Sequence, residues 1–323
     1  MSEAVRLGVL GCADIAIRKV LPALAHVPSI RLVAVASRTA EKAAEVAHRF
    51  GCAAVAGYEE LLDRTDIDAV YVPLPPALHA DWVSAALRCG KHVLAEKPLT
   101  PHPAETAALL DLATSARRVL MENIMFPHHS RQRRVRDLVT TGAIGNPLAF
   151  TGSFTIPARP ASDIRNSASL GGGALLDAAV YPVAAAQMLL GELDVASAVL
   201  RHDRELGVDV AGAALLHGAG DVTAQVVFGM RHAYTSEYQV LGDRGRITVE
   251  NAYHPRADAV TEIRLQSRNG TAETLVVPPD DQCANTLEAF AQAVLKSNTG
   301  PVGDLTSRTA VLIDEMRRRA PAA

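Results

Sequence analysis

The sequence has few aromatic residues, 4% of the chain, only four cysteines, and no marked excess of either charge. Lys plus Arg total 32 and Asp plus Glu 35, so the net charge of −3 gives no electrostatic reason to expect nucleic acid or an anionic membrane as a partner. The apolar runs are shorter than the ~20 residues of a membrane span, and the first residues lack the basic start and apolar region of a signal peptide. The cysteines lie far apart without a C-x-x-C pair, which predicts reduced, mostly buried thiols in a cytoplasmic protein.

What the chain does contain is an alternation of short apolar runs and helical patterns over its first 122 residues. Such alternation implies right-handed βαβ units in a parallel, doubly wound sheet. From residue 123 onward, β runs follow one another closely, which is typical of a large, mostly antiparallel open sheet. We therefore predict an α/β chain of two domains. A Rossmann NADP-binding domain is expected over residues 1–122, and an α+β substrate-binding and oligomerisation domain over residues 123–323.

The first expected strand, residues 5–10, leads into Gly11-Cys12-Ala13-Asp14-Ile15-Ala16 and then into a helical pattern. A strand, a tight glycine turn and a helix N-terminus that faces a pyrophosphate form the dinucleotide fingerprint. Ala13 stands where the fingerprint has its second glycine, and Ala16 is an accepted variant of the third. We predict that residues Gly11 to Ile15 contact a cofactor; the alternative is a turn glycine with a purely steric role.

The end of the second expected strand, where the cofactor's ribose is recognised, reads Ala36-Ser37-Arg38. An acidic residue there would accept a hydrogen bond from the 2′-hydroxyl of NAD, whereas a hydroxyl and a guanidinium suit a 2′-phosphate. We therefore predict NADP(H), with Ser37 and Arg38 as ligands; the alternative is that Arg38 is an ordinary solvated charge. After residue 72 the rigid segment that contains Leu74 and Pro75, with His79 beyond it, is predicted to line the nicotinamide-ribose, unless it is only a stiff connection.

A short apolar run over residues 92–95, expected to be a buried strand, ends in Glu96-Lys97-Pro98. In an open α/β sheet ligands bind at the carboxyl ends of strands, and a lysine is seldom placed there for packing. Lys97 is therefore our first candidate for a catalytic group, against the alternative of a lysine that extends into solvent.

A second candidate centre is the segment Gly171-Gly172-Gly173, which is followed by Asp177 and Tyr181. The acid and the phenol are four residues apart and share one helix face, where they can hold a sugar-like substrate and relay a proton. The alternative is a glycine-rich turn with a tyrosine in the core.

The arginines at 131, 133, 134 and 136 are predicted to form a solvated helix face. The adjacent histidines 128 and 129 lack further ligands at metal-binding spacing, so no metal is expected.

Taken together, these segments resemble the glucose–fructose oxidoreductase / inositol dehydrogenase family of two-domain nicotinamide oxidoreductases. The shared pieces are Gly-Val-Leu-Gly at 8–11, Glu96-Lys97-Pro98, and Gly171-Gly172-Gly173-x-x-x-Asp177-x-x-x-Tyr181. The resemblance implies that Lys97 lies by the nicotinamide and the substrate carbonyl, that the bond before Pro98 is cis, and that Glu96 and Asn123 belong to the cofactor site. Tyr181 replaces the usual histidine of the family and Ala179 a glycine, a form that occurs in a branch acting on sugars and diols.

A closer resemblance is to the sugar 3-ketoreductases of bacterial deoxysugar pathways, on the matching segments 11–16, 71–75, 120–123, 153–157 and 229–234. It implies NADPH-dependent reduction of the C-3 ketone of a dTDP-linked 3,4-diketo-2,6-dideoxyhexose. Lys97 or Tyr181 would then protonate the carbonyl oxygen, where negative charge develops, and Asp177 would position a hydroxyl or partner Lys97.

Two rival functions fit the same pattern. One is an NADP-dependent sugar or trans-dihydrodiol dehydrogenase on the same scaffold, and the other is a non-catalytic NADP-binding sensor, because fold alone does not decide function. A broad sheet with one uncovered apolar face also predicts a homodimer or homotetramer.

Overall fold

The computed structural model describes residues 4–296 and 304–321. The described chain divides into two compact units, one formed by residues 1–125 with 283–304 and the other by residues 126–282 with 305–323. The predicted division after residue 122 treated each domain as one continuous segment, whereas a late segment of the chain groups with the first unit.

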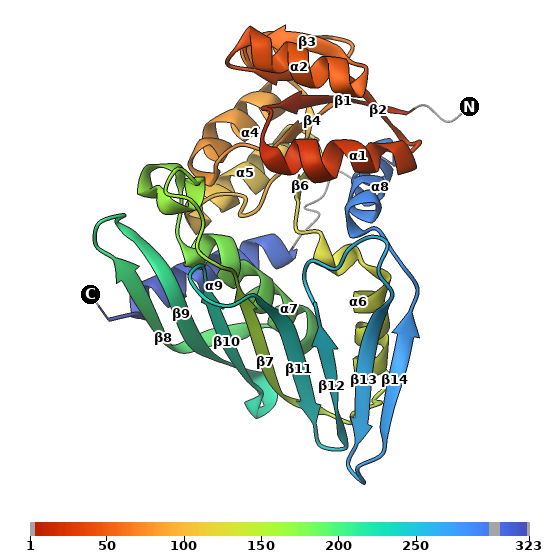
Figure 1. Ribbon diagram of the computed structural model, residues 1–323, viewed down its shortest axis with the longest axis vertical. Coiled ribbons are helices and arrows are strands. Elements are labelled where there is room, and N and C mark those ends of the chain that lie inside the picture. Colours follow the sequence, from red (N-terminus) through yellow and green to blue (C-terminus); the bar gives the residue numbers. More distant parts are fainter. Residues whose placement is uncertain (1–3, 297–303, 322–323) are drawn as a thin grey trace. The chain divides into compact units, whose positions relative to one another are not determined.

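The first unit is built on a six-stranded parallel sheet of order β3-β2-β1-β4-β5-β6, so the predicted doubly wound fold is confirmed (Figure 1). Its strands are β1 (Val5–Leu10), β2 (Ile30–Ser37), β3 (Ala53–Ala56), β4 (Ala69–Val72), β5 (His92–Ala95) and β6 (Leu120–Glu122). Its helical segments are η1 (Ala16–Val20), α1 (Leu21–Ala23), η2 (Leu24–His26), α2 (Ala40–Phe50), α3 (Glu59–Leu62), η3 (Pro76–Leu78), α4 (His79–Arg88), α5 (Pro103–Ser115) and α8 (Gln282–Leu295). Strands buried on both faces, such as β4, explain the continuous apolar runs.

Apolar side chains cover both faces of this sheet. One core combines strand residues such as Leu7 and Tyr71 with residues of α1, α2 and α8, including Leu287 and Phe290. The other combines the alternate strand residues, such as Val70, with residues of α3, α4 and α5. Helix α8, which the sequence analysis did not anticipate, therefore completes the first core although it follows the whole second sheet in the sequence.

The second unit contains an eight-stranded sheet of order β14-β13-β12-β11-β7-β10-β9-β8, in which only β7 and β10 pair in parallel. Its strands are β7 (Pro147–Thr155), β8 (Leu193–Asp203), β9 (Val208–Gly218), β10 (Thr223–Gly229), β11 (Thr235–Gly242), β12 (Gly245–Glu250), β13 (Thr261–Ser267) and β14 (Ala272–Val277). Its helical segments are η4 (Phe126–His128), α6 (Ser130–Thr140), η5 (Ile164–Asn166), η6 (Ala168–Leu170), η7 (Leu175–Ala179), α7 (Val180–Leu190), η8 (Ala219–Asp221) and α9 (Asp304–Arg319). Helices α6 and α7 pack on one face, and alternate residues of strands such as β10 are buried there (Figure 1). The predicted large, mostly antiparallel sheet is confirmed.

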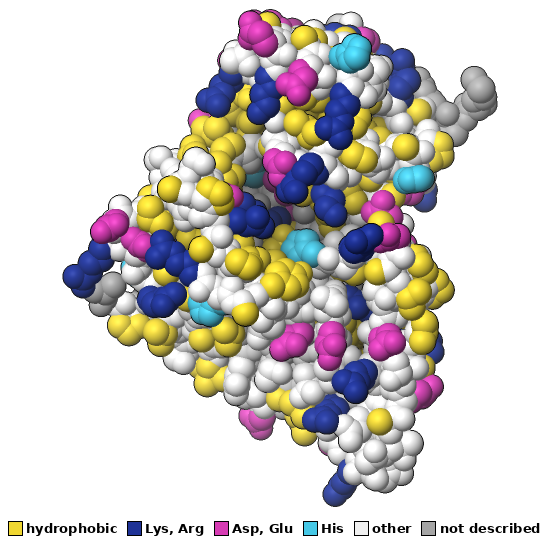
Figure 2. Space-filling view, in the orientation of Figure 1, with side chains coloured by type: hydrophobic (Ala, Val, Ile, Leu, Met, Phe, Trp, Pro, Cys, Tyr) yellow, Lys and Arg dark blue, Asp and Glu magenta, His cyan; other side chains and the backbone are white. Residues whose placement is uncertain are grey.

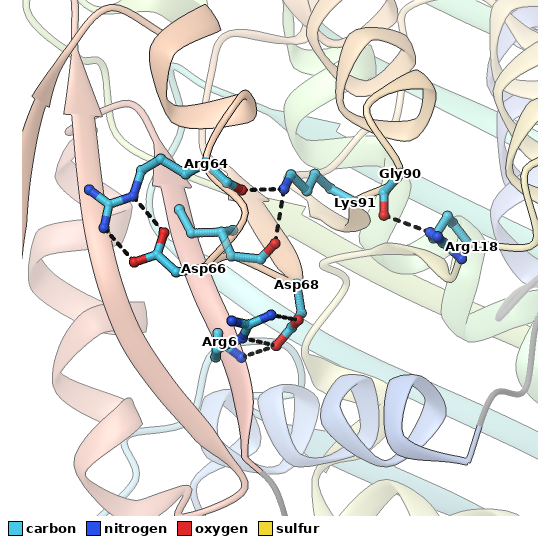
Figure 3. Close-up of polar contacts among 8 residues, drawn as sticks. Arg6, Arg64, Asp66, Asp68, Gly90, Lys91 and Arg118 are labelled. Atoms are coloured by element: carbon cyan, nitrogen blue, oxygen red, sulfur yellow. Dashed lines mark hydrogen bonds and ion pairs between the residues drawn. The ribbon is translucent and has the colours of Figure 1, made fainter.

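A polar network holds the amino ends of the parallel strands, which is the end opposite the expected ligand site (Figure 3). The Arg6 guanidinium donates to the Asp68 carboxylate at 2.9 and 2.6 Å. Lys91, which is 7% exposed, donates from Nζ to the carbonyl oxygens of Arg64 (2.6 Å) and Ile67 (3.0 Å). Lys91 is thus a structural lysine that closes the turn between α3 and β4.

The helical stretch Ala168–Leu190 is long and apolar enough to cross a membrane by length and composition, contrary to the expectation that no stretch reaches that length. Of its most apolar window, 78% is buried inside the protein, which is typical of a core helix. All four cysteines are free, as predicted; Cys12 and Cys283 are buried and Cys89 is exposed.

Candidate active site

The turn after β1 has the geometry of a phosphate-binding turn. Gly11 has φ +117°, and a Cβ there would lie 2.8 Å from Leu74 Cδ2, so the position requires glycine. The first backbone bond of the following helix runs from Ile17 N to Ala13 O at 3.1 Å, so the amides of residues 14–16 precede it. Amides at a helix N-terminus bind phosphate. The turn therefore fits the pyrophosphate of a dinucleotide.

Two side chains of this turn differ in their surroundings. Cys12 is buried, its Sγ lies 3.8 Å from the Ala36 carbonyl oxygen, and burial raises its pKa. Asp14 is exposed and pairs with Arg18, one turn further along the helix. A ligand would therefore meet the backbone of Cys12 rather than a reactive thiolate.

The ribose-recognition end of β2 carries no carboxylate. Ser37 is 6% exposed, and its Oγ accepts a hydrogen bond from Thr39 N at 3.4 Å, whereas Arg38 is exposed. Tyr58, which was not predicted from the sequence, also lies at the Gly11 turn. Its hydroxyl is 3.6 Å from the position that a Cβ on Gly11 would take. Burial raises the pKa of Tyr58, and the charge of Arg38 lowers it to a smaller extent. A hydroxyl, a guanidinium and a phenol suit a 2′-phosphate.

The segment after β4 lies over the same turn, because Leu74 is the residue that Gly11 must accommodate. Pro75 is extended, with φ −60° and ψ 145°. His79 was expected to face the cofactor, but the structure buries it completely. Its Nε2 lies 2.8 Å from Leu74 O, and its Nδ1 lies 3.1 Å from the carbonyl oxygens of both Pro98 and Leu99. His79 is therefore a brace between the segments that follow β4 and β5.

Glu96 ties together the carboxyl ends of three neighbouring strands. Its Oε1 accepts from Tyr71 Oη and from Asn123 Nδ2, both at 2.6 Å, and its Oε2 accepts from Lys97 N at 3.3 Å. Burial and then the charge of Glu96 raise the pKa of Tyr71 well above its ordinary value, so the phenol stays a donor. The Lys97–Pro98 peptide bond is cis, as the resemblance implies. The half-buried Lys97 thus leaves a rigid turn at the carboxyl end of β5.

Asp177 belongs to the second unit, in the π-helical turn η7 that follows the glycine segment. Its Oδ2 accepts from Arg165 Nε at 2.6 Å, and the same guanidinium pairs with Asp163 at 3.1 Å. Burial opposes the charged guanidinium, but the two carboxylates outweigh it and raise the pKa of Arg165. A Cβ on Gly172 would lie 2.5 Å from Arg165 O, so glycine at this position lets the backbone of the glycine segment approach the backbone of η5. The carboxylate of Asp177 is therefore oriented by Arg165, a partner that the sequence did not reveal.

Tyr181 is the second residue of α7 in the same unit and is 8% exposed. Its ring packs edge-on against Phe154, with centroids 4.7 Å apart, and lies 5.7 Å from the ring of Tyr253. Its hydroxyl lies 3.1 Å from His254 Nε2. An acidic hydrogen in a largely apolar setting, next to an imidazole, can protonate a developing alkoxide. Sequence reasoning missed His254, which lies in the loop after β12.

The arginine cluster is only partly the solvated face that was predicted. Arg133, Arg134 and Arg136 are exposed, but Arg131 is 1% exposed. Its guanidinium donates to the carbonyl oxygens of the loop that carries His254. The neighbouring His129 is also buried, and its Nδ1 accepts from Arg131 N at 3.0 Å. Among the residues that the structure describes, no three His, Cys, Asp or Glu side chains are placed to hold a metal ion.

Comparison with known proteins bears on both units. Residues 5–124 match the model of the oxidoreductase family with an NAD-binding Rossmann fold, and residues 132–248 match the GFO/IDH/MocA C-terminal domain. A dTDP-3,4-didehydro-2,6-dideoxy-alpha-D-glucose 3-reductase of Streptomyces violaceoruber is 52% identical, over 98% of this chain and 96% of the relative. One of the same description from Actinomadura kijaniata is 46% identical, over 99% and 96%. The crystal structure of KijD10, a 3-ketoreductase from Actinomadura kijaniata in complex with NADP and TDP-benzene, matches with a TM-score of 0.94 at 46% identity and covers 98% of both chains.

Proposed function

The chain belongs to the GFO/IDH/MocA family of oxidoreductases, and on that premise we propose that it reduces the C-3 ketone of a dTDP-linked 3,4-diketo-2,6-dideoxyhexose with NADPH. The observation that carries the proposal is full-length identity of 52% to a reductase of that description. The Ser37-Arg38 end of β2 and the Gly11 turn support NADP(H) as the cofactor. Leu74, Pro75 and the backbone of residues 11–15 are proposed to line its site.

The two units supply different parts of the proposed chemistry. When bound, the reduced nicotinamide supplies the hydride that adds to the C-3 carbon. The carbonyl oxygen then gains negative charge and needs a proton or a cation. Lys97, on the turn that Glu96, Tyr71 and Asn123 hold, is proposed to meet that need in the first unit. Tyr181 is the proposed alternative donor in the second.

Asp177 is proposed to orient a sugar hydroxyl rather than to accept a proton. Its carboxylate accepts a hydrogen bond from Arg165 at 2.6 Å, and that ion pair fixes the position of the carboxylate. Glu96 and Asn123 are likewise proposed to shape the cofactor site through the turn that bears Lys97, since their side chains are bonded to each other at 2.6 Å.

The test is NADPH consumption with dTDP-3,4-diketo-2,6-dideoxyglucose generated in situ, with NADH as the cofactor control. Lys97→Ala and Tyr181→Phe would be compared with Lys42→Ala, which alters an exposed lysine of α2. Loss of one donor is expected to lower kcat by ~10²–10³, and the larger loss identifies the proton donor. Lys42→Ala should match the unaltered protein.

Two results would contradict the proposal. Near-normal turnover in both Lys97→Ala and Tyr181→Phe would exclude both residues as the proton donor. Absent turnover of the diketo sugar, with NADPH still bound, would favour oxidation of a sugar or trans-diol with NADP⁺, which a substrate screen in that direction would reveal. Binding without turnover in either direction would favour the sensor function.

We propose further that the protein is a homo-oligomer that associates through the uncovered face of the eight-stranded sheet. Val199, Leu215 and Val227 are 63%, 39% and 44% exposed on neighbouring strands of that face. Figure 2 views the sheet from this side, where uncharged side chains predominate between scattered charged ones. Light scattering should give a dimer or tetramer, and Leu215→Arg should shift it toward monomer; a monomeric unaltered protein would contradict the proposal.

The last two predictions concern the cellular location of the protein and its binding to nucleic acid or membranes. We propose a cytoplasmic enzyme without nucleic-acid or membrane partners, in keeping with the net charge of −3. Fractionation of producing cells should recover the ketoreductase activity with the cytoplasm. Recovery with the membrane fraction would contradict this proposal.

A further inference from the structure

We propose that His254 is a positioning residue for Tyr181: it donates a hydrogen bond from Nε2 to the phenolic oxygen and returns a proton to it during turnover. The inference rests on the proposed function, and within that function it assigns to Tyr181 the protonation of the sugar oxygen. The carrying observation is the distance of 3.1 Å between His254 Nε2 and Tyr181 Oη.

The surroundings of the two side chains differ in a way that suits a proton relay. Tyr181 is 8% exposed, and its ring lies among those of Phe154, Tyr253 and Phe126, at 4.7, 5.7 and 6.4 Å between centroids. His254 packs edge-on against Tyr181, 4.6 Å away at 72°, yet the histidine is exposed. The imidazole can therefore exchange protons with solvent, whereas the phenol is screened from it by aromatic rings.

The direction of this hydrogen bond decides what Tyr181 can do. A phenol has one hydrogen, so if it donated that hydrogen to His254, none would point at a substrate. If His254 donates instead, the hydroxyl hydrogen remains available for the sugar oxygen. A neutral histidine can carry its proton on either nitrogen, so the form that donates from Nε2 is accessible.

A hydride adds to the C-3 carbon and breaks the π bond of the ketone. The electron pair that remains on oxygen takes the proton from Tyr181 Oη. His254 takes a proton from solvent on Nδ1, and the Nε2 proton of the resulting imidazolium moves to the phenolate oxygen. Exchange with solvent then moves the remaining proton of the ring from Nδ1 back to Nε2. Ketone, NADPH and one proton thus become alcohol and NADP⁺, and both side chains return to their starting state.

The loop that carries His254 is held at several points by buried groups. Arg131 donates to the carbonyl oxygens of Glu250 and Asn251 at 2.9 and 2.6 Å, and Gln282 Nε2 donates to Tyr253 O at 3.0 Å. Two further bonds join the loop to Ser236 of β11: Ala252 N donates to its carbonyl oxygen at 2.8 Å, and Tyr253 N to its Oγ at 3.1 Å. Such anchoring fixes the imidazole relative to the phenol, as a relay requires.

The alternative is that His254 only packs against Phe154, whose ring lies 5.1 Å away at 35°. Three variants separate packing from proton supply. His254→Leu keeps apolar bulk and removes both nitrogens. His254→Gln keeps an amide donor near the position of Nε2 but cannot exchange a proton. His254→Ala leaves space for imidazole added to the buffer, and His217→Ala, which alters an exposed histidine of β9, is the control.

In the NADPH assay we expect His254→Leu and His254→Ala to lower kcat by ~10–100-fold with KM changed less than about threefold, as for removal of a group that assists general acid catalysis. His254→Gln should fall between these variants and the unaltered protein. Added imidazole should restore a large part of kcat to His254→Ala and have no effect on His217→Ala. A kcat within about threefold of the unaltered value in His254→Leu, or full activity in His254→Gln, would overturn the inference.

A second measurement does not depend on turnover. In long-range ¹H–¹⁵N spectra of the histidines, assigned by the loss of one resonance in His254→Gln, His254 should be protonated at Nε2 near neutral pH, and Tyr181→Phe should shift that resonance. A neutral ring that carries its proton on Nδ1 would overturn the inference. Absent turnover in the unaltered protein would contradict the proposed function alone, because the spectra still decide the state of the pair.

Discussion

Replacing the buried Arg131 by methionine tests whether one side chain holds the loop after β12. Met retains most of the aliphatic length of Arg, so the substitution removes the charged head with little change in packed volume. The guanidinium is 1% exposed and donates to the carbonyl oxygens of Glu250, Asn251 and Ala252 at 2.9, 2.6 and 3.3 Å. The first acceptor is the last residue of β12, and the other two are in the loop that carries His254.

The expected cost follows from these three bonds. Hydrogen bonds to a charged group contribute about 1.5–3 kcal/mol each. The bond at 3.3 Å is long and counts for less, and relief from burying the charge offsets part of the loss. We therefore expect Arg131→Met to lower the free energy of unfolding by about 3–5 kcal/mol.

The assay is urea unfolding at pH 7, with Arg134→Met as the matched control, because Arg134 is exposed on the same helix. The control should change stability by less than about 0.5 kcal/mol. Under conditions where Arg131→Met is still folded, its kcat should fall while NADPH binding, assigned to the first unit, is unchanged. A loss of stability below about 1 kcal/mol would refute the reasoning, since it would mean that the loop finds other donors.

Three further predictions concern the first unit. Lys91→Met, which leaves the carbonyl oxygens of Arg64 and Ile67 without their donor, should cost about 1–3 kcal/mol of stability without altering KM for NADPH. Burial and then the charge of a neighbouring arginine lower the pKa of His92 to about 4, and its Nδ1 accepts a backbone N–H at 2.9 Å. The unfolded chain therefore takes up this proton first, and stability should fall as pH drops from about 6.5 to about 4; in urea titrations across that range His92→Asn should lose less, and an unchanged slope would contradict the assignment. Arg38→Asp should raise KM for NADPH by ~10-fold or more and that for NADH far less, and equal effects on both would remove Arg38 from the 2′-phosphate site.

The fold was largely predictable because most of its strands are visible in the sequence as short apolar runs. Buried parallel strands such as residues 92–95 are short apolar runs, and the predicted ends of that strand match β5. Strand β3, Ala53–Ala56, was missed because it is a four-residue edge strand in which only alternate residues are sheltered. Helix α8 was missed as a part of the first unit because nothing in a local pattern states which sheet a helix will cover.

The site was predictable where chemistry sits at a strand end, as with Lys97. It was not predictable where the site depends on contacts between residues far apart in the sequence. His254 and Tyr181, for example, are hydrogen-bonded although 73 residues separate them. For Arg131 a signal existed and was misread. Val135, Leu138 and Val139 follow it at intervals of four, seven and eight residues, so helical periodicity places Arg131 on the buried face. The charge of the side chain suggested solvent, and the periodicity was the better guide.

The return of α8 to the first unit has a consequence for how the protein is made. Cys283, Leu287, Phe290 and Ala291 complete a core whose other buried members lie before residue 126. The nucleotide-binding sheet therefore leaves the ribosome early. One of its apolar faces stays partly uncovered until the second sheet and then α8 have been translated. A nascent chain arrested before residue 283 should be cut by protease within its first 125 residues, and one arrested after the full chain has emerged should resist. The first sheet, although it is synthesised first, is therefore covered on both faces only after the late helix α8 has been made.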